Sequence, residues 1–190
     1  MRNHIVLLSL IATVSCGCEK YGLEPTEQVI GTSSDRDFGF VGYWREIRET
    51  RDTSPPFEIA IQKNTTDANY VISGVDLTFD VMTVTFTAIE VAPEKKHAIV
   101  EIQLADSAGN TMRRLVYATV HNEELRVWSI NVVPLGDMLY DASIPAVIEH
   151  FFLSSKVRCN PDALLKILRK NPKQLLGEMR RFEMVEAKGK

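Results

Sequence analysis

The chain has 190 residues, of which 45% are hydrophobic and 25% charged, and its formal net charge is −3. This length and balance favour one globular domain with its own core. The weakly acidic charge offers no basic field for nucleic acid. The three cysteines, Cys16, Cys18 and Cys159, have the spacing of neither a disulfide framework nor a zinc site, so we expect no metal.

The N-terminus has the order of a secretory signal. Arg2 supplies one positive charge, residues 5–14 form an apolar run broken only by Ser9 and Thr13, and small residues follow. The run is about ten residues long, about half of what a membrane-spanning helix needs. We therefore interpret residues 1–15 as a signal peptide, whose removal changes the net charge from −3 to −4.

The residues around the expected cleavage point resemble the lipobox of bacterial lipoproteins. Cys16 follows Thr13-Val14-Ser15, of which the last two fit the pattern and Thr13 replaces the usual Leu. Cys18 follows Gly17 and is the alternative acylation site. The resemblance implies a lipid-anchored protein of the bacterial cell envelope that contacts the membrane through this lipid. The other interpretation is an ordinary signal peptide cut nearby, with both cysteines incidental.

The region after the cysteine is polar and aperiodic. It includes Glu24-Pro25-Thr26-Glu27 and the stretch from Gly31 to Asp37. We interpret residues 16–37 as the lipidated cysteine and an extended or disordered tether, and residues 38–190 as a single domain.

Short runs of β-branched, aromatic and alternating apolar residues predict strands from Val41 onward. Eight are expected, at 41–47, 57–63, 70–72, 75–81, 83–91, 98–104, 115–120 and 125–132. Turn residues separate them, and residues 121–124 are typical of a hairpin. Close, regular strands without an intervening helix favour a sandwich or a barrel.

The pattern changes after Pro134. Ser143 and Pro145 predict the start of a helix over 146–153, and Asn160-Pro161-Asp162 is a stronger start signal for a second helix. A short turn is expected after Pro172, ending at Gly177. Residues 181–186 are the candidate last strand that closes the sheet.

Gly42-Tyr43-Trp44 on the first predicted strand, with the meander and late helix that follow, resembles the lipocalin-like (calycin) barrels over about residues 40–187. Two helical segments before the last strand depart from the usual single helix. The resemblance implies a mainly β fold, an antiparallel meander of about eight strands forming a barrel, with one or two C-terminal helices and a closing strand. Barrels of this kind have room for one small guest.

No catalytic constellation is found. The three histidines of the predicted domain, His97, His121 and His150, are far apart, and neither a nucleophile elbow nor a phosphate loop occurs. We therefore expect a non-enzymatic protein without a cofactor that binds a small apolar ligand or an envelope protein. The candidate cavity residues are Trp44, Phe79 and Tyr117, although strand aromatics also simply fill cores.

Two alternatives stay open at this stage. One is an envelope hydrolase with an unrecognised site, which a histidine beside a carboxylate in a cleft would favour. The other is a structural or inhibitory lipoprotein with a solid core.

Overall fold

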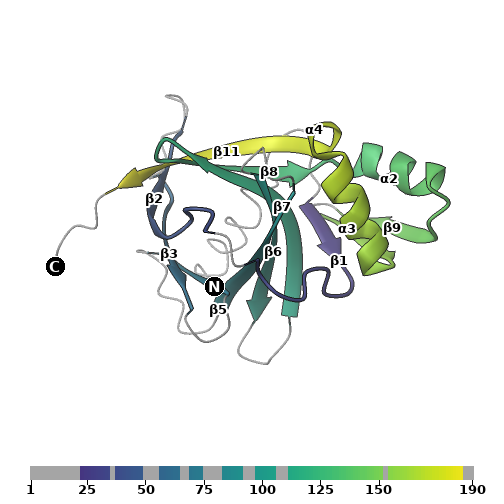
Figure 1. Cartoon of the computed structure of the whole chain (residues 1–190), viewed down its shortest axis with the longest axis horizontal. Coiled ribbons are helices and arrows are strands. Elements are labelled where there is room, and N and C mark those ends of the chain that lie inside the picture. The colour runs from purple at the N-terminus through teal and green to yellow at the C-terminus, as the bar shows by residue number, and fades with distance from the viewer. Residues whose placement is uncertain are drawn as a thin grey trace.

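The computed structural model describes residues 22–34, 37–48, 56–64, 69–74, 83–91, 97–105, 111–151 and 154–185. Within these residues the chain forms a closed antiparallel barrel of eight strands, with further strands and short helices on one flank (Figure 1). The barrel strands are β2 (Gly42–Glu46), β3 (Glu58–Lys63), β4 (Tyr70–Gly74), β5 (Thr83–Glu90), β6 (His97–Ala105), β7 (Thr111–His121), β8 (Glu124–Ile130) and β11 (Leu176–Val185).

Each barrel strand pairs with its neighbour in sequence up to β8, and β11 closes the ring by pairing with both β8 and β2. The same sheet continues beyond β7 into three further strands. These are β1 (Gly22–Pro25), β10 (Ser154–Cys159) and β9 (Ala146–His150), with β1 between β7 and β10. The predicted fold class is thereby confirmed, and the architecture agrees with a lipocalin-like barrel.

Strand alternation divides the apolar residues into two cores. One, the interior core, fills the barrel, and on β7 it receives Val116 and Ala118. The other, the outer core, lies between the outside of the barrel and the helices, and it receives Leu115 and Tyr117 from the opposite face of the same strand. A strand with both faces covered is apolar without interruption, which is what residues 115–118 are.

Two local features fix the barrel geometry. The β7–β8 hairpin turns at Asn122 and Glu123, whose φ angles of 50° and 61° are those of a type I′ turn that matches the strand twist. Gly42 starts β2 at φ 153°, a conformation that favours glycine, and a Cβ there would lie 3.4 Å from the terminal methyl of Met184.

The helices are α2 (Val132–Asp141), α3 (Pro161–Lys170) and α4 (Pro172–Leu175). The α3 prediction is confirmed: the side chain of Asn160 accepts a hydrogen bond from the N–H of Ala163, and Pro161 occupies the first turn. Its apolar stripe, formed by Leu164, Ile167 and Leu168, packs into the outer core. No helix among the described residues is long and apolar enough to span a membrane.

The prediction of a helix over 146–153 was wrong. Residues 146–150 form strand β9, which pairs antiparallel with β10, and the helix lies earlier, at 132–141. Pro134 lies in the first turn of this helix, where proline is compatible with helical structure, and the side chain of Asn131 accepts a hydrogen bond from the N–H of Val133. Ser143 lies in the turn after the helix, at φ 53°.

Two further expectations are corrected. The last strand begins at Leu176 rather than at residue 181, so Gly177 lies inside the strand and does not end a turn before it. A Cβ at Gly177 would collide with the hydroxyl of Ser129. The tether prediction fails for residues 22–34, which contain β1 and the buried Val29 and Ile30. The predicted strand 75–81 lies outside the described residues.

Candidate binding cavity

The barrel encloses a partly open cavity of about 80 Å³. Among the described residues, its lining is apolar apart from one arginine, Arg114 on β7. The lining residues are Phe40, Ile59, Ile61, Ile72, Phe86, Val100, Ile102, Leu104, Arg114, Val116, Ala118, Leu125, Val127 and Phe182. These side chains point inward because they occupy alternate positions of seven barrel strands, apart from Phe40, which lies just before β2.

One end of the barrel interior is filled by aromatic rings, and we call it the aromatic end. Tyr70 and Phe86 are stacked with centroids 4.6 Å apart, and Phe40 meets both rings edge-on at 5.8 and 5.7 Å. Trp44 is fully buried in the same core, and its indole N–H donates to the carbonyl of Phe40 over 2.8 Å. This bond holds Phe40, two residues before β2, at the floor of the cavity.

The opposite end of the interior is charged. Arg180 on β11 and Arg48 after β2 both donate to the carboxylate of Glu46, at the end of β2. Arg114, at the start of β7, donates to Glu24 of β1 over 2.9 Å. We call these ion pairs the charged end. A guest in the cavity therefore meets apolar walls, an aromatic floor and one buried cation, Arg114.

The Arg114–Glu24 pair is buried on both sides. Leu23 lies opposite Leu115 in the β1–β7 pairing, which places Glu24 beside Arg114 on the interior face. Burial lowers the pKa of Arg114, and the neighbouring carboxylate of Glu24 opposes this change. The pair closes the interior at the end of the barrel where the β7–β8 pairing stops and β1 pairs with β7 in place of β8.

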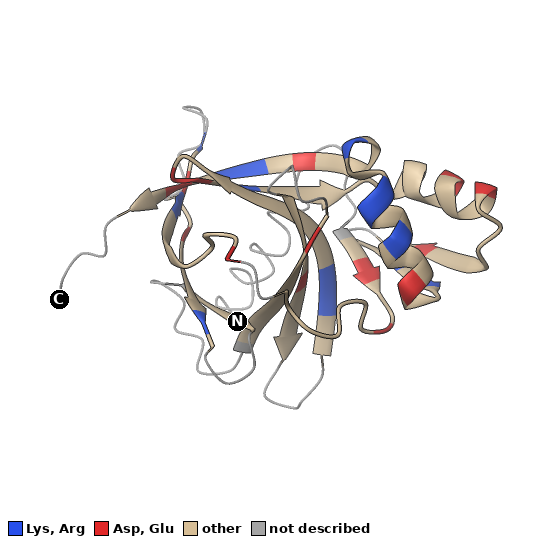
Figure 2. Cartoon of the chain, in the orientation of Figure 1, with Lys and Arg blue, Asp and Glu red and all other residues tan. Residues whose placement is uncertain are grey.

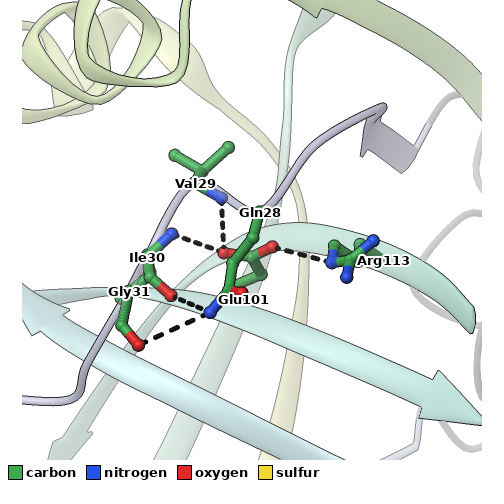
Figure 3. Close-up of polar contacts among 6 residues, drawn as sticks. All are labelled: Gln28, Val29, Ile30, Gly31, Glu101 and Arg113. Carbon is green, nitrogen blue, oxygen red and sulfur yellow. Dashed lines mark hydrogen bonds and ion pairs between the residues drawn. The ribbon is translucent and has the colours of Figure 1, made fainter.

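The segment from β1 to Ser34, which we call the N-terminal strap, crosses the outside of the barrel. Glu101 on β6 receives the backbone N–H groups of Val29 and Ile30 at 3.0 and 2.6 Å, and the guanidinium of Arg113 lies 3.6 Å away (Figure 3). Burial raises the pKa of Glu101, while these backbone donors and Arg113 act in the other direction.

Further along, the strap completes the free edge of β5. The hydroxyl of Ser33 accepts from the N–H of Ala88, and the N–H of Ser34 donates to the carbonyl of Ala88. The strap therefore bonds to β7, β6 and β5 in turn, which holds one wall of the cavity together.

The predicted cavity residues do not lie together. Trp44 is in the interior core, at the aromatic end. Tyr117 lies in the outer core instead, where its hydroxyl donates to the carbonyl of Leu168 on α3 over 2.8 Å, and burial raises its pKa. The strand alternation that puts Val116 and Ala118 inside puts Tyr117 outside. Phe79 lies outside the described residues.

The candidate chemical residues are also apart. His97 is half-buried beside Trp128, His121 is exposed at the end of β7, and His150 on β9 hydrogen-bonds Ser155. Cys159 lies opposite Ala146, whereas His150 lies opposite Ser155, so Cys159 and His150 are four positions apart along the β9–β10 pair. Burial raises the pKa of the Cys159 thiol. Among the described residues, no group of three His, Cys, Asp or Glu side chains has the arrangement of a metal site.

No model of a known family, no curated protein and no solved structure matches this chain.

Sequence reasoning missed Arg114 and Glu24. Arg114 shares the two-residue period of Val116 and Ala118, so extending that alternation backwards places it inside the barrel. Glu24 carried no comparable signal, because its polar neighbours made the segment look like a tether.

Proposed function

We propose that this protein is a lipid-anchored lipoprotein of the bacterial cell envelope that binds a small apolar ligand inside its barrel. The observation that carries the binding part is the cavity of about 80 Å³, whose lining is apolar except for Arg114. Apolar cavities that stay dry take up apolar guests, because such a guest gains contacts and leaves water.

The size of the cavity limits the guest. An engineered apolar cavity of about 150 Å³ admits benzene, and sites for drug-sized ligands are about 300–1,000 Å³. A volume of about 80 Å³ suits the end of an unbranched alkyl chain or a molecule of a few heavy atoms. The chain end would rest against Phe40 and Phe86, and the rest of the ligand would point toward Arg114.

Native mass spectrometry of the chain from its own host tests the ligand. We expect a small mass that disappears on denaturation. Ala118→Leu, which adds three carbons to the cavity wall, should lower its occupancy at least fivefold. Ala146→Leu is the control, because Ala146 is exposed on β9 outside the barrel. A wild-type chain without any bound mass would favour the structural alternative with a filled core.

The anchor rests on the lipobox-like residues before Cys16. Metabolic labelling with a fatty acid should mark the wild-type chain and the Cys18→Ala variant, and it should not mark Cys16→Ala. Label that persists in Cys16→Ala and disappears in Cys18→Ala would move the anchor to Cys18. An unlabelled wild-type chain would overturn the lipid anchor and leave the cavity proposal to its own test.

A further inference from the structure

We propose that the anchored domain lies with one helical flank against the bilayer and that this flank recognises anionic lipid headgroups. The surface consists of Lys166, Arg169 and Lys170 on α3 and Lys173 on α4, all exposed, and we call it the basic face. The inference rests on the proposed lipid anchor and adds an orientation and a lipid preference to it.

The basic face follows from the packing of α3. The apolar stripe of α3 is buried in the outer core, so the charged residues of the helix face solvent. Lys166, Arg169 and Lys170 are spaced by three and one, the spacing of one helix face, and Lys173 follows on α4. Figure 2 shows these cations on the flank of the molecule away from the barrel.

The path of the chain brings the anchor to this flank. β1 and β7 are antiparallel with Leu23 opposite Leu115, and Tyr117 lies two positions further along β7, in the direction of the start of β1. The hydroxyl of Tyr117 bonds the carbonyl of Leu168, in the last turn of α3. The last turn of α3, which carries Arg169 and Lys170, therefore lies beside the start of β1.

The distance to the anchor is short. Cys16 precedes Gly22 by six residues, which span at most about 20 Å when fully extended. The tether expected from the sequence was about twenty residues long, and the structure shortens it because the strap belongs to the folded body. A lipid at Cys16 thus holds the start of β1 within about 20 Å of the membrane surface.

The positive charge of this face favours an anionic bilayer as its binding partner. The mature chain is acidic overall, yet the basic face gathers four cations. None of the four forms an ion pair with another residue in the part of the chain that the structure describes. Three exposed acids lie on α3 and α2: Asp162, one turn before Lys166 on α3, and Asp137 and Asp141 on α2. Lysine and arginine near a membrane surface are attracted to anionic lipids within a Debye length.

Lysine footprinting tests the orientation. The full chain, purified from bacterial membranes, is placed in vesicles of phosphatidylcholine alone or with about 30% phosphatidylglycerol, and its lysines are acetylated and counted by mass spectrometry. We expect modification of Lys166, Lys170 and Lys173 to fall at least fivefold in the anionic vesicles, and the protection to weaken at high salt. Lys63 on β3, across the barrel from the helices (Figure 1), is the internal control and should not change.

A pair of single variants tests the charge. Lys170→Glu should restore modification of Lys166 and Lys173 in the anionic vesicles, whereas Lys63→Glu should leave their protection intact. Both side chains are exposed.

The intact mass of the same samples separates the two proposals. An acylated chain whose basic face is modified equally in both vesicles overturns the orientation and keeps the anchor. A chain without acyl groups and without protection overturns both. Protection of a chain without acyl groups supports the basic face as a lipid-binding surface and overturns the anchor.

Discussion

Arg114 and Glu24 form a buried ion pair that joins two strands ninety positions apart in sequence. The guanidinium of Arg114 lies 2.9 Å from the carboxylate of Glu24. Arg114 belongs to the barrel and Glu24 to the N-terminal strap, so the pair couples the cavity wall to the segment that leads to the proposed anchor. Its loss would leave one charge in a site from which water is excluded.

Replacement of Glu24 by alanine should therefore lower the free energy of unfolding by about 3–5 kcal/mol, the usual cost of removing one partner from a buried pair. Chemical denaturation measures the change. Glu27→Ala is the matched control, because Glu27 is exposed two residues after β1, and it should change stability by less than about 0.5 kcal/mol. Equal effects of the two variants would mean that the pair contributes nothing.

Glu101 holds the strap as an acceptor of two backbone N–H groups, and two substitutions separate this role from its charge. Glu101→Gln keeps an acceptor oxygen, and burial already raises the pKa of the carboxyl, so we expect a loss of about 1 kcal/mol or less. Glu101→Leu removes both acceptors and should cost about 2–4 kcal/mol, because each buried N–H without a partner costs about 1–3 kcal/mol. Denaturation and hydrogen exchange at Val29 and Ile30 report the difference; identical losses would contradict it.

Tyr117 completes the hydrogen bonding of α3. The carbonyl of Leu168 would normally accept from the residue four positions later, which is Pro172 and has no N–H, and the Tyr117 hydroxyl takes that place. Tyr117→Phe should therefore cost about 1–3 kcal/mol in unfolding free energy. Tyr140→Phe is the control, since Tyr140 is 85% exposed and should have no measurable effect. A silent Tyr117→Phe would show that the carbonyl finds another donor.

Trp44 and its neighbour Tyr43 point to opposite faces of β2. Trp44 is 0% exposed and Tyr43 is 39% exposed. Trp44→Ala should cost about 3–5 kcal/mol, the range for a large core aromatic, and Tyr43→Ala much less. Thermal or urea denaturation of both variants checks the assignment, and a loss below about 1 kcal/mol for Trp44→Ala would place the indole outside the core.

Glu124 gives the barrel a component of stability that depends on pH. Hydrogen bonds from Arg181 and then Arg126 lower its pKa to about 2. Because the folded-state pKa lies below the unfolded value, the contribution is present above the ordinary carboxyl pKa and is lost as the pH falls toward about 2. Unfolding free energy measured from pH 5 to pH 2 should fall less steeply in Glu124→Gln than in the wild type. Parallel curves would refute this linkage.

The barrel could be predicted from sequence because its strands carry a local signal. Residues 57–63 and 98–104 place apolar residues at alternate positions, and the hairpin at 121–124 has turn residues of its own. The helix at 161–170 was equally clear, because its cap, its proline and its apolar stripe agree. These elements do not depend on distant residues for their identity.

The site could not be predicted in the same way, because its parts are set by long-range pairing. Glu24 becomes buried only when β1 pairs with β7. Tyr117 lies on the outer face of the barrel because of the register of β7, which composition does not reveal. Residues 146–150 have an apolar sequence compatible with helix or strand, and the partner strand β10 decides between them.

The closure of the ring by β11 has a consequence for biosynthesis. Residues 182–185 pair with residues 43–46, so the first and last strands of the barrel meet across almost the whole domain. A chain that is still emerging from the ribosome leaves both β2 and β8 without their shared neighbour, and exposed strand edges invite pairing with other chains. Folding therefore completes only after the C-terminal strand is released, and truncation before Leu176 should yield aggregates rather than a smaller barrel.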